Sequence, residues 1–116
     1  MKYLCLVYYD EQEVYGRRAG EWDALVNQCL SYGEEVRASG HFVAGQALQP
    51  VATAKTVRVR DGKVHITDGP FAETKEQLAG FYLLEAADLN EAIQVASRIP
   101  PARLGSIEVR PVRELE

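Results

Sequence analysis

Cysteine is scarce in this chain, and long apolar runs are missing from it. The two cysteines, Cys5 and Cys29, form no CxxC pair, which excludes a disulfide scaffold and favours reduced, buried thiols. No apolar stretch reaches the roughly 18–20 residues that span a bilayer. The apolar start of the chain has no small-residue cleavage site and is followed by Asp10 and Glu11, so it predicts a strand and not a signal peptide. We therefore expect a cytoplasmic protein.

Positive charge is also sparse, and the common cofactor and hydrolase motifs are absent. Thirteen Lys and Arg stand against 17 Asp and Glu, a net charge of −4, whereas nucleic-acid binding needs a concentrated basic surface. There is no glycine-rich phosphate loop, GxSxG elbow or HExxH pair. The histidines, His41 and His65, have no metal-ligand spacing. These absences predict no cofactor, no metal, and no direct nucleic-acid or membrane partner.

What the chain does have is 47% hydrophobic residues in a length of 116, which suits a single domain over residues 1–116. Two segments, 2–9 and 79–86, have the composition of strands and are apolar on both faces. A strand with one wet face alternates apolar and polar residues. Both segments are therefore predicted to lie between two covered layers.

Helical periodicity marks two further segments. From Glu21 to about Ser39, apolar residues form one continuous stripe, and Gly40 supplies a left-handed stop. The stripe consists of Trp22, Leu25, Val26, Cys29, Leu30, Gly33 and Val36. A second helix is predicted to begin at Asp88, where Asp88 and Glu91 have the spacing of a capping box, and to end before the two prolines at 100–101.

Two more strands complete the pattern, together with a hairpin. Asp61-Gly62 between alternating segments predicts a type I′ turn, which pairs Arg60 with Lys63 and Val59 with Val64 in a hairpin over 56–67. Strands are also predicted at 42–48 and 106–112, the latter at a sheet edge because Pro111 lacks an N–H.

The order of elements is β-α-β-β-β-β-α-β, and without the hairpin it is the β-α-β-β-α-β order of a ferredoxin-like fold. We therefore predict an α+β fold: a ferredoxin-like sheet with two helices on one face and an inserted β-hairpin. Two helices cover only one sheet face. Because an uncovered apolar face of several hundred Å² is rare on a monomer, we expect a second copy to cover the other face in a two-fold homodimer.

One stretch carries a family resemblance. Residues 68–82, which open with Asp68-Gly69-Pro70-Phe71, resemble the signature of DGPF-domain proteins in the YCII-related family, with further matches at 45–50, 88–92 and 105–111. The resemblance implies a chain that pairs as a dimeric α/β barrel. It also implies an association with extracytoplasmic-function sigma factors. Broader relatives have been proposed as enzymes that use an Asp–His pair.

Two residues are candidates for catalysis. Asp68 is a potential base, if Phe71 buries it; the alternative is a turn role, in which its oxygen accepts from nearby backbone N–H groups. Arg103 is a potential anion clamp, because a guanidinium grips carboxylates bidentately. The alternative is that Arg103 pairs within the fold, with Asp68 or Glu108.

Four residues are candidates for ligand binding: Phe71, Glu73, Lys75 and Tyr82. Glu73 and Lys75 lie in the loop after the signature turn, where functional residues concentrate, although solvated ion pairing explains them equally well. Lys75 would contact a small anionic ligand. Tyr82 combines an apolar ring with a hydrogen-bonding tip, which suits a pocket wall as well as core or dimer packing.

Two functions follow as hypotheses. The first is a small homodimeric accessory or small-ligand-binding module, linked through the resemblance to sigma-factor regulation. The second is a small cofactor-free enzyme with acid–base chemistry in a cleft at the sheet surface of the dimer.

Overall fold

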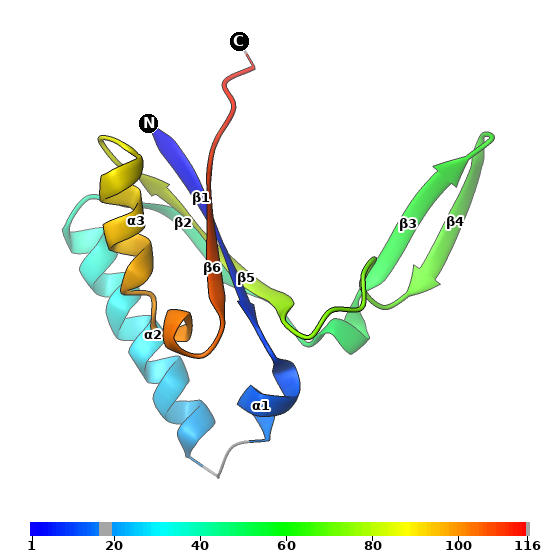
Figure 1. The fold of residues 1–116 in the computed structure, drawn as a ribbon, viewed down its shortest axis with the longest axis horizontal. Coiled ribbons are helices and arrows are strands. Elements are labelled where there is room, and N and C mark those ends of the chain that lie inside the picture. The colour runs from blue at the N-terminus through cyan, green and yellow to red at the C-terminus, as the bar shows by residue number, and fades with distance from the viewer. Residues whose placement is uncertain (17–19, 116) are drawn as a thin grey trace.

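The chain folds into a four-stranded antiparallel sheet, with helices packed on it and a hairpin that stands apart (Figure 1). The computed structural model describes residues 1–16 and 20–115. Its helices are α1 (Glu11–Tyr15), α2 (Glu21–Ala38) and α3 (Leu89–Ser97). The strands are β1 (Lys2–Tyr9), β2 (Phe42–Ala47), β3 (Lys55–Arg60), β4 (Lys63–Asp68), β5 (Gln77–Glu85) and β6 (Ser106–Pro111), and short 3-10 turns lie at Val51–Thr53 and Pro100–Arg103.

The sheet has the strand order β2-β5-β1-β6. With the hairpin set aside, this is the ferredoxin-like arrangement, which confirms the predicted fold class. β6 is an edge strand, as Pro111 predicts. Helix α1 was not indicated by the apolar pattern. It begins at Asp10, whose carboxylate accepts the N–H of Gln12 at 3.0 Å, an ordinary N-cap.

The core lies between the sheet and the helices α2 and α3. On β1, alternate side chains from Tyr3 to Tyr9 are at most 6% exposed. From Cys5 to Tyr9 they join a cluster that includes Leu25 and Val36 from α2 and Ala96 from α3. Tyr3 packs in a smaller cluster with Ala86 and Ala92. Alternation along the strand therefore assigns this face of the sheet to the helices.

The other face of the sheet is apolar and only half-buried. The register places Leu6 beside Phe81 and Leu4 beside Leu83, and it pairs Tyr8 with a leucine of β5. None of these side chains belongs to the core cluster or packs against it. The prediction that β1 and β5 are apolar on both faces is thus confirmed, and the described residues leave one of the two faces open.

The structure confirms two helix boundaries that local sequence signals predict: the end of α2 and the start of α3. After α2, Gly40 has a φ of 82°, its N–H donates to the carbonyl of Arg37, and the N–H of His41 donates to that of Val36. This is a Schellman motif. At α3, Asp88 accepts the N–H of Glu91 at 2.9 Å, as the capping box predicts.

The predicted stripe of α2 is only partly buried. Leu25 and Val36 face the core, but Leu30 is 65% and Trp22 39% exposed. Tyr32, which lies outside the stripe, is 6% exposed instead, and its hydroxyl donates to the carbonyl of Val95 on α3. Helix α2 is thus tied on its α3 side, and the Leu30 side of its apolar surface is left uncovered beside β2.

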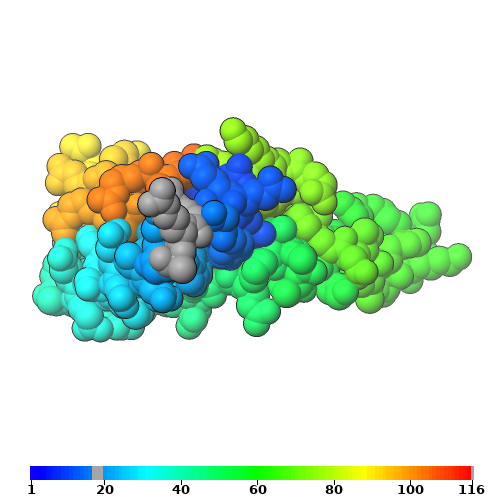
Figure 2. All heavy atoms as spheres, turned by 90° about the horizontal axis from the view of Figure 1, so that it is seen from below, coloured from blue at the N-terminus to red at the C-terminus, as the bar shows by residue number. Residues whose placement is uncertain are grey.

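The hairpin has the predicted register and turn. Val57 pairs with Ile66 and Val59 with Val64, and the turn residues Asp61 and Gly62 have φ values of 53° and 74°, as a type I′ turn requires. β3 and β4 hydrogen-bond to each other and form a sheet of their own. Figure 2 shows the hairpin as a tapering projection from the body.

Candidate functional site

A cleft of about 370 Å³ opens where α2 leaves the sheet uncovered. Its walls come from one side of α2 and from β2 and β5, and they are mainly apolar. The lining includes Trp22, Val26, Cys29, Leu30, Gly33, Phe42, Gly45, Ala47 and Tyr82. A concave apolar hollow with a few polar groups is the usual form of a small-molecule site.

Two glycines keep the cleft open. On α2, Gly33 lines the cleft, and a β-carbon at this position would meet nothing within 4 Å. On β2, Gly45 lies opposite Tyr82, where a β-carbon would stand 3.1 Å from the carbonyl oxygen of Phe81. No neighbouring atom requires a glycine at position 33, so the effect of the missing side chain is to leave space in the cleft.

Apart from the Glu34–Arg37 pair, the ionisable groups that line the cleft are neutral at physiological pH. Burial raises the pKa of the Tyr82 hydroxyl to about 12 and also raises the pKa of the Cys29 thiol. The pKa of Tyr9 is likewise raised, by burial first and by its hydrogen bond to Tyr15 second. Among the described residues, the Tyr82 hydroxyl has no hydrogen-bond partner. It is therefore a protonated donor available to a ligand.

The charged residues of the cleft compensate one another. Arg37 donates to the carboxylate of Glu34 at 3.3 Å, and its guanidinium lies 4.5 Å from the centroid of the Phe42 ring. At Trp22, the indole makes an edge contact with Tyr15 of α1, with ring centroids 5.0 Å apart. The aromatic wall at Trp22 is thus held by α1, and the cleft has no unbalanced charge in its lining.

Asp68 lies at the root of the hairpin. Its side chain is 85% exposed and accepts from Lys55 Nζ at 2.5 Å. Phe71 is 81% exposed, so it does not bury Asp68. Lys55 Nζ, and no backbone N–H of the described residues, donates to the Asp68 carboxylate, so the expected turn bond is not found; the Gly69 N–H donates across the hairpin root to the carbonyl of Ala54 at 2.8 Å.

The other candidates lie in different places. Glu73 and Lys75 are exposed in the loop before β5, and Tyr82 lines the cleft. Arg103 donates to the side-chain oxygen of Gln28 on α2 at 2.9 Å, in a shallow polar hollow. The internal pairing expected for Arg103 is found, but its partner is Gln28 and not Asp68 or Glu108. No hydrogen bond or ion pair joins Arg103 to Asp68.

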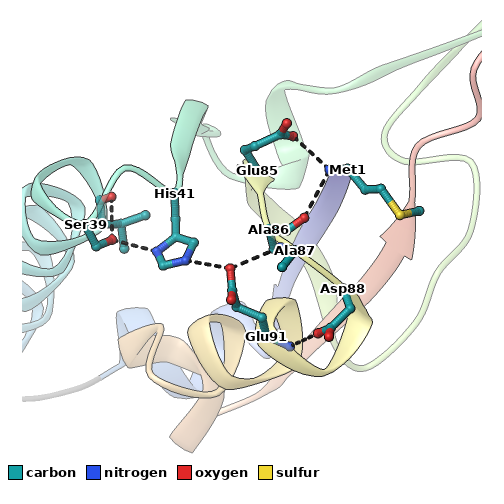
Figure 3. A network of polar contacts seen from close by, with 9 residues as sticks. Met1, Ser39, His41, Glu85, Ala86, Ala87, Asp88 and Glu91 are labelled. Carbon is teal, nitrogen blue, oxygen red and sulfur yellow. Dashed lines mark hydrogen bonds and ion pairs between the residues drawn. The ribbon is translucent and has the colours of Figure 1, made fainter.

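His41 belongs to a polar network that the sequence did not indicate (Figure 3). Its Nδ1 lies 2.7 Å from Ser39 Oγ and its Nε2 lies 3.0 Å from Glu91 Oε1. Glu91 also accepts the N–H of Ala87 at 3.1 Å. These two bonds, the Ala87 one first, lower the pKa of Glu91. The network joins the end of α2 to the start of α3, and none of its side chains lines the cleft.

Within residues 1–16 and 20–115, no group of three His, Cys, Asp or Glu side chains is placed to hold a metal ion. In the same residues, no helix is long and apolar enough to cross a membrane.

The fold and the comparisons define the class of protein. The chain is a ferredoxin-like α+β protein of the kind seen in YCII-like dimeric α/β barrels. The family model of the YCII-related domain matches residues 1–116, and the chain belongs to this family.

This chain is similar to a curated protein and to a solved structure. An uncharacterised protein of Rhizobium meliloti, R00369, is 36% identical over 114 residues, which is 97% of this chain and 92% of the relative. A 5-chloro-2-hydroxyhydroquinone dehydrochlorinase of Burkholderia phenoliruptrix, solved in complex with 2,5-dihydroxybenzoquinone, superposes with a TM-score of 0.50 at 17% identity. The superposition covers 97% of this chain and 94% of the dehydrochlorinase, and it shows a shared fold.

The cleft was missed at the level of sequence, although a signal for it existed. The predicted stripe of α2 has the width of an ordinary amphipathic helix, so its width gives no indication of the cleft. The signal is Gly33, a poor helix former in the middle of an apolar stripe.

Proposed function

We propose that this protein is a small-ligand-binding module of the YCII-related family and that the cleft between α2 and the β2–β5 edge is its binding site. The observation that carries the proposal is the hydroxyl of Tyr82, a protonated donor without a partner in an otherwise apolar hollow. The cleft is open to solvent, so a ligand that supplies an acceptor exchanges the hydration of this hydroxyl for a direct hydrogen bond, a net gain of about 1 kcal/mol.

The lining selects for a neutral ligand with a flat, apolar body. The walls are mostly hydrocarbon and aromatic, and the pair Arg37–Glu34 is already neutralised. A charged ligand would lose its hydration without gaining a counter-ion. A neutral phenol satisfies these conditions, since its ring is apolar and its oxygen accepts from Tyr82. The small anionic ligand predicted from Lys75 and Arg103 finds no comparable setting in the cleft.

The single tryptophan of the chain, Trp22, lines the cleft, so its fluorescence reports binding directly. We expect titration with p-cresol to change the Trp22 emission with a saturable, one-site profile. Replacement of Tyr82 by Phe removes the donor and should weaken binding about 5- to 10-fold, the value of one hydrogen bond of about 1–1.4 kcal/mol.

Gly33 offers a matched pair of variants. Gly33→Leu places a side chain in the cleft and should abolish the titration, whereas Gly33→Ala adds one methyl group at the same position and should retain it. Gly33→Ala is expected to fold, because nothing stands within 4 Å of the added β-carbon, and far-UV circular dichroism checks the fold of Gly33→Leu. Equal binding by wild type and Gly33→Leu would refute the site.

We also propose that the protein works as a homodimer. The support is the open, apolar face formed by β1 and β5, which a second copy of the same face would cover. Sedimentation equilibrium at micromolar protein tests this. A stable single-chain particle would contradict it.

The enzymatic alternative, with Asp68 as base and Arg103 as anion clamp, needs both groups at one site. Its support is the dehydrochlorinase that shares the fold. Within one subunit Asp68 is engaged by Lys55 and Arg103 by Gln28, so the alternative requires that the dimer bring them together. Loss of a screened turnover in Asp68→Asn, without loss of melting temperature, would favour it.

The link to sigma factors remains a prediction from the family resemblance. Co-purification of a sigma factor with the tagged protein from its native cell would support the link, and its absence from such pull-downs would count against it.

A further inference from the structure

The hairpin β3–β4 has no partner for its apolar side. Val57, Val59, Val64 and Ile66 lie on one face as two directly opposed pairs, and each is 57–66% exposed. An isolated two-stranded hairpin is marginally stable at best in water, and it normally packs against further structure. The four exposed β-branched side chains therefore form an apolar surface that is suited to pack against further structure.

The root of the hairpin is fixed, so the arm keeps its direction. Gly69, with a φ of 94°, donates to the carbonyl of Ala54, and its own carbonyl accepts from Thr56 Oγ1 at 2.8 Å. Lys55 and Asp68 form an ion pair across the same end. Phe71 follows immediately and is 81% exposed. The residues 68–71 thus brace the arm and add an aromatic ring at its base.

The amount of surface on the chain fits a second copy. Its solvent-accessible area is 8103 Å², whereas a compact monomer of 12.9 kDa has about 6,300 Å². The radius of gyration is 16.0 Å against about 13 Å expected for this length. The excess of about 1,800 Å² per chain exceeds the roughly 800 Å² that each partner buries in a standard interface and is in the range of permanent dimers.

The charges of the arm and of the body are opposite. Residues 55–68 hold four basic and two acidic side chains, a net charge of +2. Because the whole chain carries −4, the remainder carries −6. An arm of one sign on a body of the other favours contact between copies of the same chain.

We propose that the β3–β4 hairpin is a dimerisation arm: its strip Val57–Val59–Val64–Ile66, continued by Phe71, packs on the body of a second copy of this chain. The contact is reciprocal under two-fold symmetry, so each subunit both gives and receives an arm. Asp68 is then a positioning residue that holds the arm through Lys55. This proposal rests on the proposed homodimer and names the segment that makes it.

The test is the dimer dissociation constant, measured by sedimentation velocity over a dilution series, with far-UV circular dichroism to check folding. The double variant Val57→Ser/Ile66→Ser should raise that constant at least about 100-fold, since each dimer loses four buried aliphatic side chains. Phe71→Ser lies outside both strands, so it leaves the hairpin intact, and it should raise the constant about 10-fold or more. The matched control His65→Ser changes the opposite face of the same strand and should change it less than threefold.

The outcomes separate the two proposals. A dimeric wild type whose dissociation constant is unchanged by the strip variants and by Phe71→Ser overturns the arm and leaves the homodimer standing. A wild type that stays monomeric at micromolar concentration overturns both. Equal weakening by His65→Ser and by the strip variants also overturns the arm, because it shows a general loss of hairpin structure.

Discussion

The hydrogen bond from the Tyr32 hydroxyl to the Val95 carbonyl sets where α2 lies, and its removal has a calculable effect. Tyr32 is 6% exposed, and the bond joins two helices through residues that are 63 positions apart in the chain. In Tyr32→Phe the ring stays in place, and Arg98, 5.4 Å from the ring centroid, keeps its contact with an aromatic face.

The free-energy loss in Tyr32→Phe is set by what happens to the Val95 carbonyl. This oxygen also accepts the N–H of Arg98 at 3.2 Å, so it is not left without a partner. The cost therefore stays near the net value of one hydrogen bond, about 1 kcal/mol. For 116 residues the entropy of unfolding is about 0.24 kcal/mol per kelvin at the midpoint. The melting temperature should fall by about 4 °C.

Differential scanning calorimetry at one fixed protein concentration measures this shift, because a dimer's melting temperature depends on concentration. The control is Tyr82→Phe, which removes a hydroxyl without a partner among the described residues and should leave the unliganded protein's melting temperature within about 1 °C. An unchanged or raised melting temperature in Tyr32→Phe would refute the view that this bond ties α2 to α3.

Two further predictions concern stability. The pKa of Glu91 is lowered by the Ala87 N–H and by His41, so its contribution to stability is present above its ordinary value of 4.5 and is lost as the pH falls through the lowered pKa; urea unfolding from neutral pH to about pH 3 should show a shallower acid decline in Glu91→Gln, and an identical pH profile would contradict the network. In Gly105→Ala the added carbon would stand 2.0 Å from the Tyr8 carbonyl oxygen, so the free energy of unfolding should drop by about 2 kcal/mol or more, whereas a loss below about 0.5 kcal/mol would show that the loop before β6 can move away.

The features that were predictable from sequence are those decided by neighbours in the chain. Asp61-Gly62 fixes a two-residue turn, and the turn fixes the hairpin register. Gly40 and Asp88 end and begin helices through hydrogen bonds that reach no more than a few residues. The two-sided apolar pattern of β1 and β5 needs only alternation. Each of these signals depends on residues close together in the chain, so contacts with distant parts of the fold do not alter the local structure that it predicts.

The position of α2 was not predictable in the same way. Helical periodicity identifies an apolar face but not which part of it meets the sheet. Tyr32, a polar-tipped residue off the stripe, is buried because Val95 offers it an acceptor. That contact, made across the molecule, rotates Leu30 toward the solvent. The error in the predicted core and the unpredicted cleft therefore have one physical cause.

The candidate residues taken from the signature segment divide in the same manner. Tyr82 was chosen for its amphipathic side chain and lies in the cleft, because its position on β5 faces the helices. Asp68 was chosen as an acid–base group that Phe71 would bury, yet both are exposed beside the hairpin root. The sequence around Asp68 places this residue at the end of a strand. It does not show that the hairpin to which the strand belongs projects away from the main sheet.

The proposed ligand site and the proposed dimer face share the strand β5. One of its faces contributes Tyr82 to the wall of the cleft, and the other carries Leu83 beside Leu4 on the face that a second copy would cover. A strand transmits displacement from one face to the other because successive side chains share the same backbone. If both proposals hold, a ligand that fills the cleft should alter the dimer dissociation constant. Because each dimer has two clefts, linkage requires that constant to change by the square of the factor by which dimerisation changes the ligand affinity of each cleft. Sedimentation with and without p-cresol measures the first quantity, and Trp22 titration at two protein concentrations measures the second; a dimer dissociation constant unchanged by saturating p-cresol would show that the two faces are not coupled through the sheet.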